Sequence, residues 1–204
     1  LTSHARIALD TGAHVFVEKP FTYDFDTLIG IHRQLEKTPS QRLHVNHLYR
    51  YSEALRQVKL EGAQEIHLHW EKYSISSFSI EENLLSHDVS ILLSIFGLDV
   101  DFAVNSKVMS SGKLILKGEI NNVELCLSYK LNTDPYFPQI KYLKVHRANG
   151  SSQHDLLAEP VDKLQRSLEA FLDETHQKEN DAFNFHMRFA DIMRTITKHP
   201  TEHQ

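Results

Sequence analysis

The stretch that most constrains the fold is residues 13–22, AHVFVEKPFT, in which a short apolar run ends in two opposite charges and a proline. The run from His14 to Val17 is rich in β-branched and aromatic residues, which favours a buried strand. Proline cannot donate to a sheet ladder, and it biases the preceding Lys19 toward an extended backbone. In open α/β sheets, ligands bind just outside the carboxyl ends of strands. Lys19 is therefore either a ligand-binding lysine or half of a surface ion pair with Glu18 that closes the strand.

Helices alternate with strands on both sides of this run. A helix is predicted from Ser3, a suitable N-cap, to Gly12, and a second helix begins after Asp24. Residues 42–46 form a further short strand. This alternation is typical of a parallel sheet, so residues 1–46 are predicted to be the back half of a doubly wound sheet. Because the first residues already lie inside a helix–strand unit, we expect an amino-terminal segment to be missing.

After residue 47 the pattern changes to strands with fewer helices. Residues 64–70 alternate, which indicates a half-solvated antiparallel strand with His67 and His69 on one face and Ile66, Leu68 and Trp70 on the other. The other predicted elements are helices over 52–60, 80–96, 161–174 and 183–198 and strands over 101–109, 113–119, 122–130 and 140–146. The predicted fold class is therefore α/β plus α+β. A remnant of a parallel sheet precedes a domain with an open, mainly antiparallel sheet packed on helices.

The composition narrows the possible functions. Hydrophobic residues make up 41% and charged residues 24% of the 204, which is typical of a globular protein with a core. No apolar run approaches the ~20 residues that span a bilayer, and we expect no signal peptide. The net charge of −5, without a basic stripe, argues against nucleic acid as a partner. The single cysteine, Cys126, excludes an internal disulfide, which fits a reducing, cytoplasmic compartment.

Fourteen histidines raise the question of a metal site. His67 and His69 share a strand face, and His44 and His47 are close in sequence. No cysteine or carboxylate completes a four-ligand pattern with recognisable spacing. We therefore predict no metal and interpret these histidines as solvent-facing polar residues.

Three stretches, in this order, resemble the Gfo/Idh/MocA family of sugar oxidoreductases, which is named for glucose–fructose oxidoreductase, inositol dehydrogenase and a rhizopine catabolism protein. HARIALDTGAHVFVEKPFT is similar to the family's helix, apolar strand and Glu-Lys-Pro. VNHLYRYSEALRQVK is similar to the strand and Arg-containing stretch between its two domains. NLLSHD, which runs on to IFG, resembles its helix with an Asp, a His four residues later and a Gly. The resemblance covers nearly the whole chain, most closely up to residue 97.

The resemblance implies a subunit of two domains. Residues 1–47 would be the C-terminal part of a Rossmann domain that binds NAD or NADP. Residues 48–204 would form an α+β domain for substrate binding and oligomerisation. The implied reaction is hydride transfer to or from a sugar, a nucleotide-sugar or a cyclitol, in a homo-oligomer assembled through the open sheet.

The same resemblance assigns roles to individual residues. Lys19 and His87 would be catalytic. Histidine has an unperturbed pKa near ~6.5 that suits proton transfer at neutral pH, and an ammonium stabilises a developing alkoxide. The cofactor-binding residues would be Glu18, Lys19 and Pro20, and the substrate-binding residues Arg50, Asn83 and His87. A buried core histidine is the alternative for His87, and an interdomain contact is the alternative for Arg50.

Two features depart from the family's pattern. Asn83 stands in place of the family's aspartate, one helical turn before His87, and an amide can orient the imidazole but cannot take up a proton. The chain also contains no G-x-G-x-x-G, the loop that brings the backbone close to a pyrophosphate. We therefore expect a truncated oxidoreductase that lacks this loop. The alternative is a non-catalytic, truncated or decayed relative that binds a sugar or serves as an assembly module.

Overall fold

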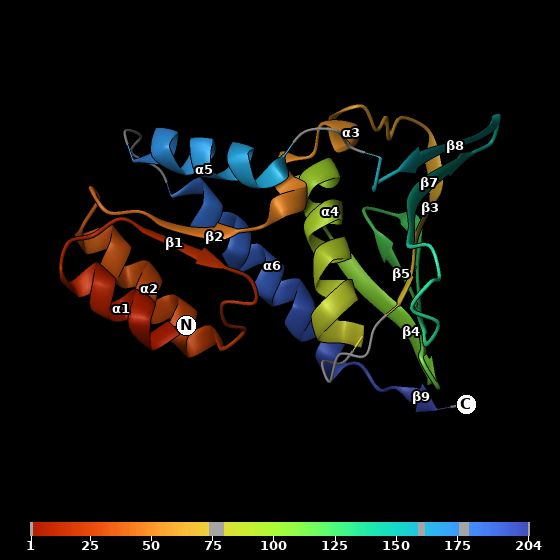
Figure 1. The fold of residues 1–204 in the computed structure, drawn as a ribbon, viewed down its shortest axis with the longest axis horizontal. Coiled ribbons are helices and arrows are strands. Elements are labelled where there is room, and N and C mark those ends of the chain that lie inside the picture. Colours follow the sequence, from red (N-terminus) through yellow and green to blue (C-terminus); the bar gives the residue numbers. More distant parts are fainter. Residues whose placement is uncertain (1, 74–79, 159–161, 176–179, 204) are drawn as a thin grey trace.

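The computed structural model describes residues 2–73, 80–158, 162–175 and 180–203, without the side chains of residues 82 and 83. Two sheets organise these residues (Figure 1). The first pairs β1, Val15–Glu18, in parallel with β2, Leu43–Asn46. The second has seven strands in the order β8-β7-β3-β6-β5-β4-β9. The predicted fold class, a small parallel sheet followed by an open and mainly antiparallel sheet with helices, is confirmed.

The first sheet alternates with two helices, α1 (Thr2–Asp10) and α2 (Phe25–Lys37), as the sequence predicts. Asp24 caps α2, because its carboxylate accepts a hydrogen bond from the Thr27 backbone N–H at 3.0 Å. Gly12 follows α1 with a φ of +85°, a conformation that glycine adopts without strain. These local signals place Lys19 directly after the last residue of β1.

The seven-stranded sheet is built from β3 (Ala63–Tyr73), β4 (Phe102–Ser110), β5 (Lys113–Ile120), β6 (Val123–Asn132), β7 (Ile140–Arg147), β8 (Gly150–Asp155) and β9 (Glu202–His203). Strand β3 pairs antiparallel with β7 but parallel with β6, so its prediction as an antiparallel strand is only half right. A single strand's pattern does not reveal the direction of its neighbours. Strands β8 and β9 were not predicted. The sequence of β8, GSSQHD, is polar, and β9 has only two residues.

The helices that cover this sheet differ in two places from the prediction. The helix expected over 52–60 is a 3-10 turn, η1 (Leu48–Tyr51), followed by the short α3 (Glu53–Arg56). Val58 and Leu60, beyond the end of α3, turn to pack on the core. The helix expected over 80–96 opens with a π-helical turn, η2 (Glu81–Leu85), before α4 (Ser86–Phe96).

Of the last two helices, α5 (Lys163–Glu174) runs from the large sheet toward the small one, and α6 (Asp181–Lys198) returns from the small sheet to the large one (Figure 1). Phe183 and Ala190 of α6 belong to the apolar cluster around β1 and β2. Phe185 and Phe189 belong to the cluster under the seven-stranded sheet. One helix therefore joins both cores. Among the described residues, none of the helices has the length and apolar character needed to cross a membrane.

Candidate active site

The end of β1 and the start of α4 meet, and this contact brings Lys19 to the helix that carries His87. Lys19 Nζ donates a hydrogen bond to Ser86 Oγ at 2.9 Å. Ser86 is fully buried and directly precedes His87. Two of the residues that the sequence singles out, 68 positions apart, thus lie in one site.

His87 is held between two aromatic rings. Its ring centroid lies 5.5 Å from that of Tyr49, edge to face, and 5.3 Å from that of Trp70. Burial lowers the pKa of His87 well below its usual value, and the positive charges of Lys19, Lys141 and Lys72 lower it further. The imidazole is therefore neutral at pH 7, and it is partly exposed.

Burial also lowers the pKa of Lys19 to about 8, and the charges of Lys141 and Lys72 act in the same direction. Glu18 and Asp88 oppose the shift. A lysine with this pKa can release a proton near neutral pH much more readily than an ordinary lysine. At pH 7 the site therefore contains an ammonium that can give up a proton beside an imidazole that can accept one.

Glu18 and Pro20, the other predicted cofactor-binding residues, flank Lys19 and are exposed. The Glu18 carboxylate accepts a hydrogen bond from Asn46 Nδ2 on the neighbouring strand at 2.7 Å. Asn46 Oδ1 in turn accepts one from Ser167 Oγ of α5 at 2.7 Å. Glu18 is therefore fixed by an amide and does not form the ion pair with Lys19 that would simply close the strand.

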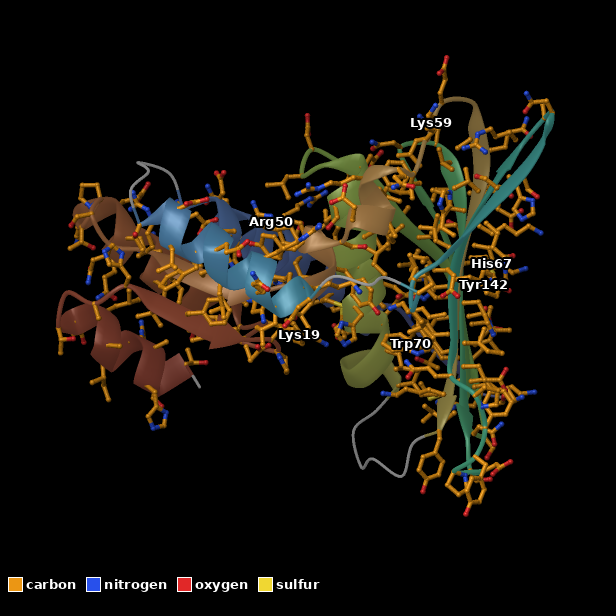
Figure 2. The ribbon with its side chains drawn as sticks, turned by 45° about the horizontal axis from the view of Figure 1, so that its top comes forward. Lys19, Arg50, Lys59, His67, Trp70 and Tyr142 are labelled. Carbon is orange, nitrogen blue, oxygen red and sulfur yellow. The ribbon has the colours of Figure 1, made fainter. Side chains whose placement is uncertain are left out.

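The predicted substrate residues do not all gather at this site. Arg50 Nη1 lies 3.9 Å from Glu174 Oε1, and its guanidinium lies 5.2 Å from the ring of Phe185. Arg50 thus belongs to a cluster with α5 and α6, separate from Lys19 (Figure 2). The side chain of Asn83 lies outside the described part of the chain. Its backbone is in the π-helical turn, so the one-turn α-helical spacing expected between Asn83 and His87 does not apply.

A buried ion pair that the sequence did not predict lies beside His87. Lys141 Nζ of β7 lies 3.0 Å from Asp88 Oδ1, and both side chains are completely buried. The ammonium lies 3.6 Å from the Trp70 ring centroid and 4.0 Å from that of Tyr49, within the range of cation–π contacts. The same two rings thus hold both Lys141 and His87.

The sequence contained one signal of this pair. In the predicted strand over 140–146, Lys141 points to the same face as Leu143 and Val145, because the three residues are two positions apart. These two apolar residues indicate that this face is turned toward the core. Burial alternates in this way along β7. A charged residue at a core position requires a partner, but the identity of that partner depends on the fold.

A chain of buried histidines links the loop after Lys19 to α4. His186 Nε2 lies 3.1 Å from the Thr22 carbonyl oxygen and must donate to it, because a carbonyl only accepts. His186 Nδ1 therefore accepts from His47 Nε2 at 3.0 Å. His47 Nδ1 and the Ser86 carbonyl oxygen share the single hydroxyl proton of Ser90, whose Oγ lies 2.8 Å from the first and 3.1 Å from the second. This order of donors applies to neutral rings, and burial favours the neutral forms because it lowers the pKa of both His47 and His186.

This placement overturns one interpretation of the histidines. His44 and His47 were expected to face solvent, but both are buried. His44 Nδ1 lies 2.9 Å from Glu174 Oε2, and its Nε2 lies 3.2 Å from Ser167 Oγ. Long-range polar partners satisfy these rings, and the local sequence does not reveal them. No group of three or more potential ligand side chains within the described ranges is arranged to hold a metal.

A hollow of about 750 Å³ lies away from this site. Its lining includes Lys59, Arg147 and His154, and it lies at the start of β3, where Figure 2 labels Lys59. Arg147 is already engaged there, because its guanidinium donates to the backbone carbonyls of Lys59 and Glu61. The hollow therefore does not coincide with the residues that carry the candidate chemistry.

Comparison with known proteins gives structural neighbours only. The chain matches no protein-family model. It also matches no curated protein. Among solved structures it is similar to KijD10, a 3-ketoreductase from Actinomadura kijaniata in complex with NADP and TDP-benzene, with a TM-score of 0.73 and 14% identity over 100% of this chain and 76% of that one. It is also similar to a myo-inositol dehydrogenase from Corynebacterium glutamicum, with a TM-score of 0.70 and 11% identity over 96% and 73% of the two chains.

These neighbours define the class of fold. The chain has the fold of the Gfo/Idh/MocA oxidoreductases over nearly all of its length, as its three sequence stretches suggested. At identities of 11–14% the similarity extends to the fold alone.

Proposed function

We propose that this chain forms the substrate half of an NAD(P)-dependent oxidoreductase that acts on a sugar, nucleotide-sugar or cyclitol. The observation that carries the proposal is the hydrogen bond from Lys19 to Ser86, which brings the ammonium beside His87. Residues 1–47 would complete the cofactor domain and residues 48–204 the substrate domain. The helix α6, which packs on both sheets, would hold the two parts together.

The residues present fit only part of a dinucleotide. Glu18, Lys19 and Pro20 stand at the carboxyl end of β1, where such a sheet receives ligands. The sequence holds no Gly-rich loop for the pyrophosphate. When bound, NAD or NADP would supply the hydride donor or acceptor, and we derive no step through it.

The chemistry of the chain's own residues is proton transfer. In the oxidation direction the neutral His87 would take the proton of the substrate hydroxyl, while the Lys19 ammonium stabilises the oxygen as negative charge develops. In the reduction direction the same proton would return from His87 to the substrate oxygen, and the Lys19 ammonium, with its pKa lowered to about 8, would again stabilise the negative charge on that oxygen. Arg50 and Asn83 remain proposed substrate residues.

The test uses the complete gene product and a panel of sugars, with NAD(P)H turnover as the measurement. His87→Ala and Lys19→Ala should each lower kcat about 10²- to 10⁴-fold, the usual range for a general acid–base group. Lys144→Ala, on the opposite face of the sheet, is the matched control and should retain turnover. Unchanged turnover in both site variants would refute the assignment.

The rival function is a non-catalytic module that binds a sugar or assembles through its sheet. The missing Gly-rich loop and Asn83 favour it. Calorimetric titration of this chain with NAD and NADP tests the missing cofactor loop, because micromolar binding is incompatible with its loss, and turnover by the complete gene product separates the two functions. No binding, together with no turnover by the complete gene product, would support the module.

The open face of the seven-stranded sheet is the proposed surface for self-association. Tyr142 and His67 lie on this face, away from α4 (Figure 2). Tyr142→Asp would place a charge on the face and should shift the protein toward monomers in light scattering after gel filtration. An unchanged molar mass from an oligomeric parent would exclude this surface.

A further inference from the structure

The ion pair between Asp88 and Lys141 ties α4 to the large sheet one residue away from His87. Asp88 Oδ1 lies 3.0 Å from Lys141 Nζ of β7, and both side chains are completely buried. Consecutive residues of an α-helix point about 100° apart, so a helix that is held at residue 88 cannot rotate freely at residue 87. The pair therefore fixes the direction in which α4 presents the imidazole.

Lys141 also lies against both rings that flank the imidazole. Its Nζ is 3.6 Å from the Trp70 ring centroid and 4.0 Å from that of Tyr49. The His87 ring in turn lies 5.3 Å from Trp70 and 5.5 Å from Tyr49, between centroids. A buried cation close to two aromatic rings attracts both of them. Both ring contacts of His87 thus lead to one ammonium group.

Stability alone does not account for a charge in this place. Leu143 and Val145, on the same face of β7 as Lys141, are fully buried and apolar. Replacing a buried ion pair by apolar side chains of similar volume often leaves stability unchanged or raises it. An apolar residue at position 141 would therefore serve the core equally well. What the ion pair adds is a fixed cation beside two rings of the candidate site.

The charges around Lys141 come from three elements. Burial lowers the pKa of Lys141 to about 8, and the charges of Lys163 on α5 and Lys72 on β3 act in the same direction, whereas Asp88 on α4 opposes the shift. Burial is also the main cause that lowers the pKa of His87, and the Lys141 charge lowers it further. Lys141 therefore acts on the imidazole through its charge as well as through the rings.

Tyr129 of β6 is a further titratable group beside the pair, and it is fully buried. Burial raises its pKa well above the usual value, and the negative charge of Asp88 raises it further. The phenol therefore stays neutral, and the negative charge of Asp88 remains available to the Lys141 ammonium.

We propose that Lys141 is a positioning residue for His87. Its ammonium group, held in place by Asp88, fixes the two aromatic rings between which the imidazole lies. That His87 exchanges a proton with a substrate rests on the proposed function, whereas the positioning contact rests on the packing of α4 against β7. Because Lys141 is completely buried, it acts on the imidazole and does not touch the substrate.

The test removes both charges of the pair together, because a single substitution would leave the other charge buried without a partner. The inner double variant is Asp88→Asn/Lys141→Met, which keeps the side chains close to their present size. The matched control is Glu71→Gln/Lys130→Met, which removes the ion pair on the outer face of the sheet. Urea unfolding shows that each variant is folded before the other measurements are made.

NMR signals of the His87 ring measure the contact in this chain without any turnover. In the inner double variant these signals should shift, and the proton affinity of the imidazole should rise about tenfold, because one nearby positive charge is removed. In the outer control the proton affinity should change less than about twofold, because exposed pairs interact weakly with distant groups. Ring signals that stay at their original positions in the inner double variant would overturn the proposal.

The unaltered chain offers a second measurement. Trp70 is the single tryptophan, so its fluorescence reports on the ring beside Lys141. The emission should change with a midpoint near pH 8, as Lys141 loses its proton. The pKa of Lys19 is also lowered to about 8, so Lys19→Met is the control and should retain the change. Constant emission between pH 7 and pH 9, or a change that disappears in Lys19→Met, would contradict the proposal.

Turnover by the complete gene product separates positioning from substrate contact. The inner double variant should lower kcat about tenfold, because a misaligned proton acceptor slows the reaction, and should change KM less than about twofold. The acid limb of its pH profile should also move to higher pH, because the imidazole binds a proton more readily. A raised KM with unchanged kcat would indicate a substrate contact and reject the positioning role.

Failure of this proposal and failure of the proposed function give different results. NMR and fluorescence responses as expected, without turnover by the complete gene product, would retain the positioning contact and reject the oxidoreductase. His87-dependent turnover, with unchanged kcat and unchanged ring signals in the inner double variant, would retain the oxidoreductase and reject the positioning role.

Discussion

The two faces of the seven-stranded sheet hold polar residues in opposite ways. On the inner face, Lys141 is completely buried and meets Asp88 at 3.0 Å. On the outer face, Lys130 pairs with Glu71 while 43% of the lysine side chain remains exposed. Strand β3 contributes to both, because its alternation sends Trp70 inward and His67 outward (Figure 2).

The difference shows what burial demands of a charge. A charge removed from water must have a partner, whereas a charge at the surface is solvated with or without one. The inner pair is also surrounded by rings and by other lysines, so changing it should affect His87. The outer pair has no such connection to the candidate site. Four predictions test this contrast, from the largest effect to the smallest.

Breaking the inner pair should cost the most stability. Asp88→Ala leaves the Lys141 ammonium buried without its partner, and such a loss typically costs about 3–5 kcal/mol. Lys130→Ala on the outer face should cost about 1 kcal/mol or less. Urea unfolding monitored by Trp70 fluorescence measures both. Similar costs for the two variants would mean that the faces do not differ as described.

Acid should destabilise the protein through its buried histidines. Burial lowers the pKa of His186 from 6.5 to about 4. Between these values the unfolded chain binds more protons than the folded one, so stability falls as the pH falls from about 6.5 toward 4. The loss for this residue is about 3 kcal/mol at pH 4, from linkage.

Urea unfolding at several pH values measures this effect. The outer-face double variant His67→Asn/His69→Asn should retain most of the acid sensitivity, because the linked His47 and His186 are untouched. Stability that stays constant between pH 7 and pH 5 would contradict the neutral His47–His186 pair.

Alkaline pH should slow the proposed reaction, because the inner face loses positive charge. The pKa values of Lys19 and Lys141 are both lowered to about 8, mainly by burial. Above pH 8 the site loses positive charge, whereas an ordinary lysine keeps its charge to about pH 10. The kcat of the complete gene product should therefore fall about tenfold between pH 7 and pH 9, as the protonated fraction of Lys19 falls around its pKa of about 8. A kcat that first falls near pH 10 would indicate an ordinary lysine instead.

The smallest effect should come from the hydroxyl that joins two outer histidines. Ser128 Oγ lies 2.8 Å from both His67 Nε2 and His69 Nδ1. Ser128→Ala removes both hydrogen bonds on a half-solvated face, where water can replace them, and should cost about 1 kcal/mol. Thermal unfolding would measure this cost. A loss of stability larger than that of Asp88→Ala would mean that the outer face, and not the inner one, contributes more to stability.

Local patterns predicted most elements of the fold. The Asp24 cap, the Gly12 stop and the alternation of β5 to β7 act within a few residues, so one sequence is enough to recognise them. The Asn121–Asn122 turn between β5 and β6 has positive φ at both residues, a conformation that asparagine adopts more readily than most residues. The polar edge strand β8 and the parallel direction of β6 beside β3 were not predicted, because both depend on pairing with distant strands.

For the candidate site too, local patterns predicted some features, and the others depend on elements distant in the sequence. The sequence by itself determined that Lys19 ends a buried strand, that His87 lies on an apolar helix and that Lys141 has the phase of a core residue. Only the tertiary structure decided that these three meet around Trp70 and Tyr49, that Asp88 neutralises Lys141 and that Arg50 joins a different cluster. The physical reason is that periodicity fixes which side of an element a residue occupies. The charge it then meets is set by elements many residues away.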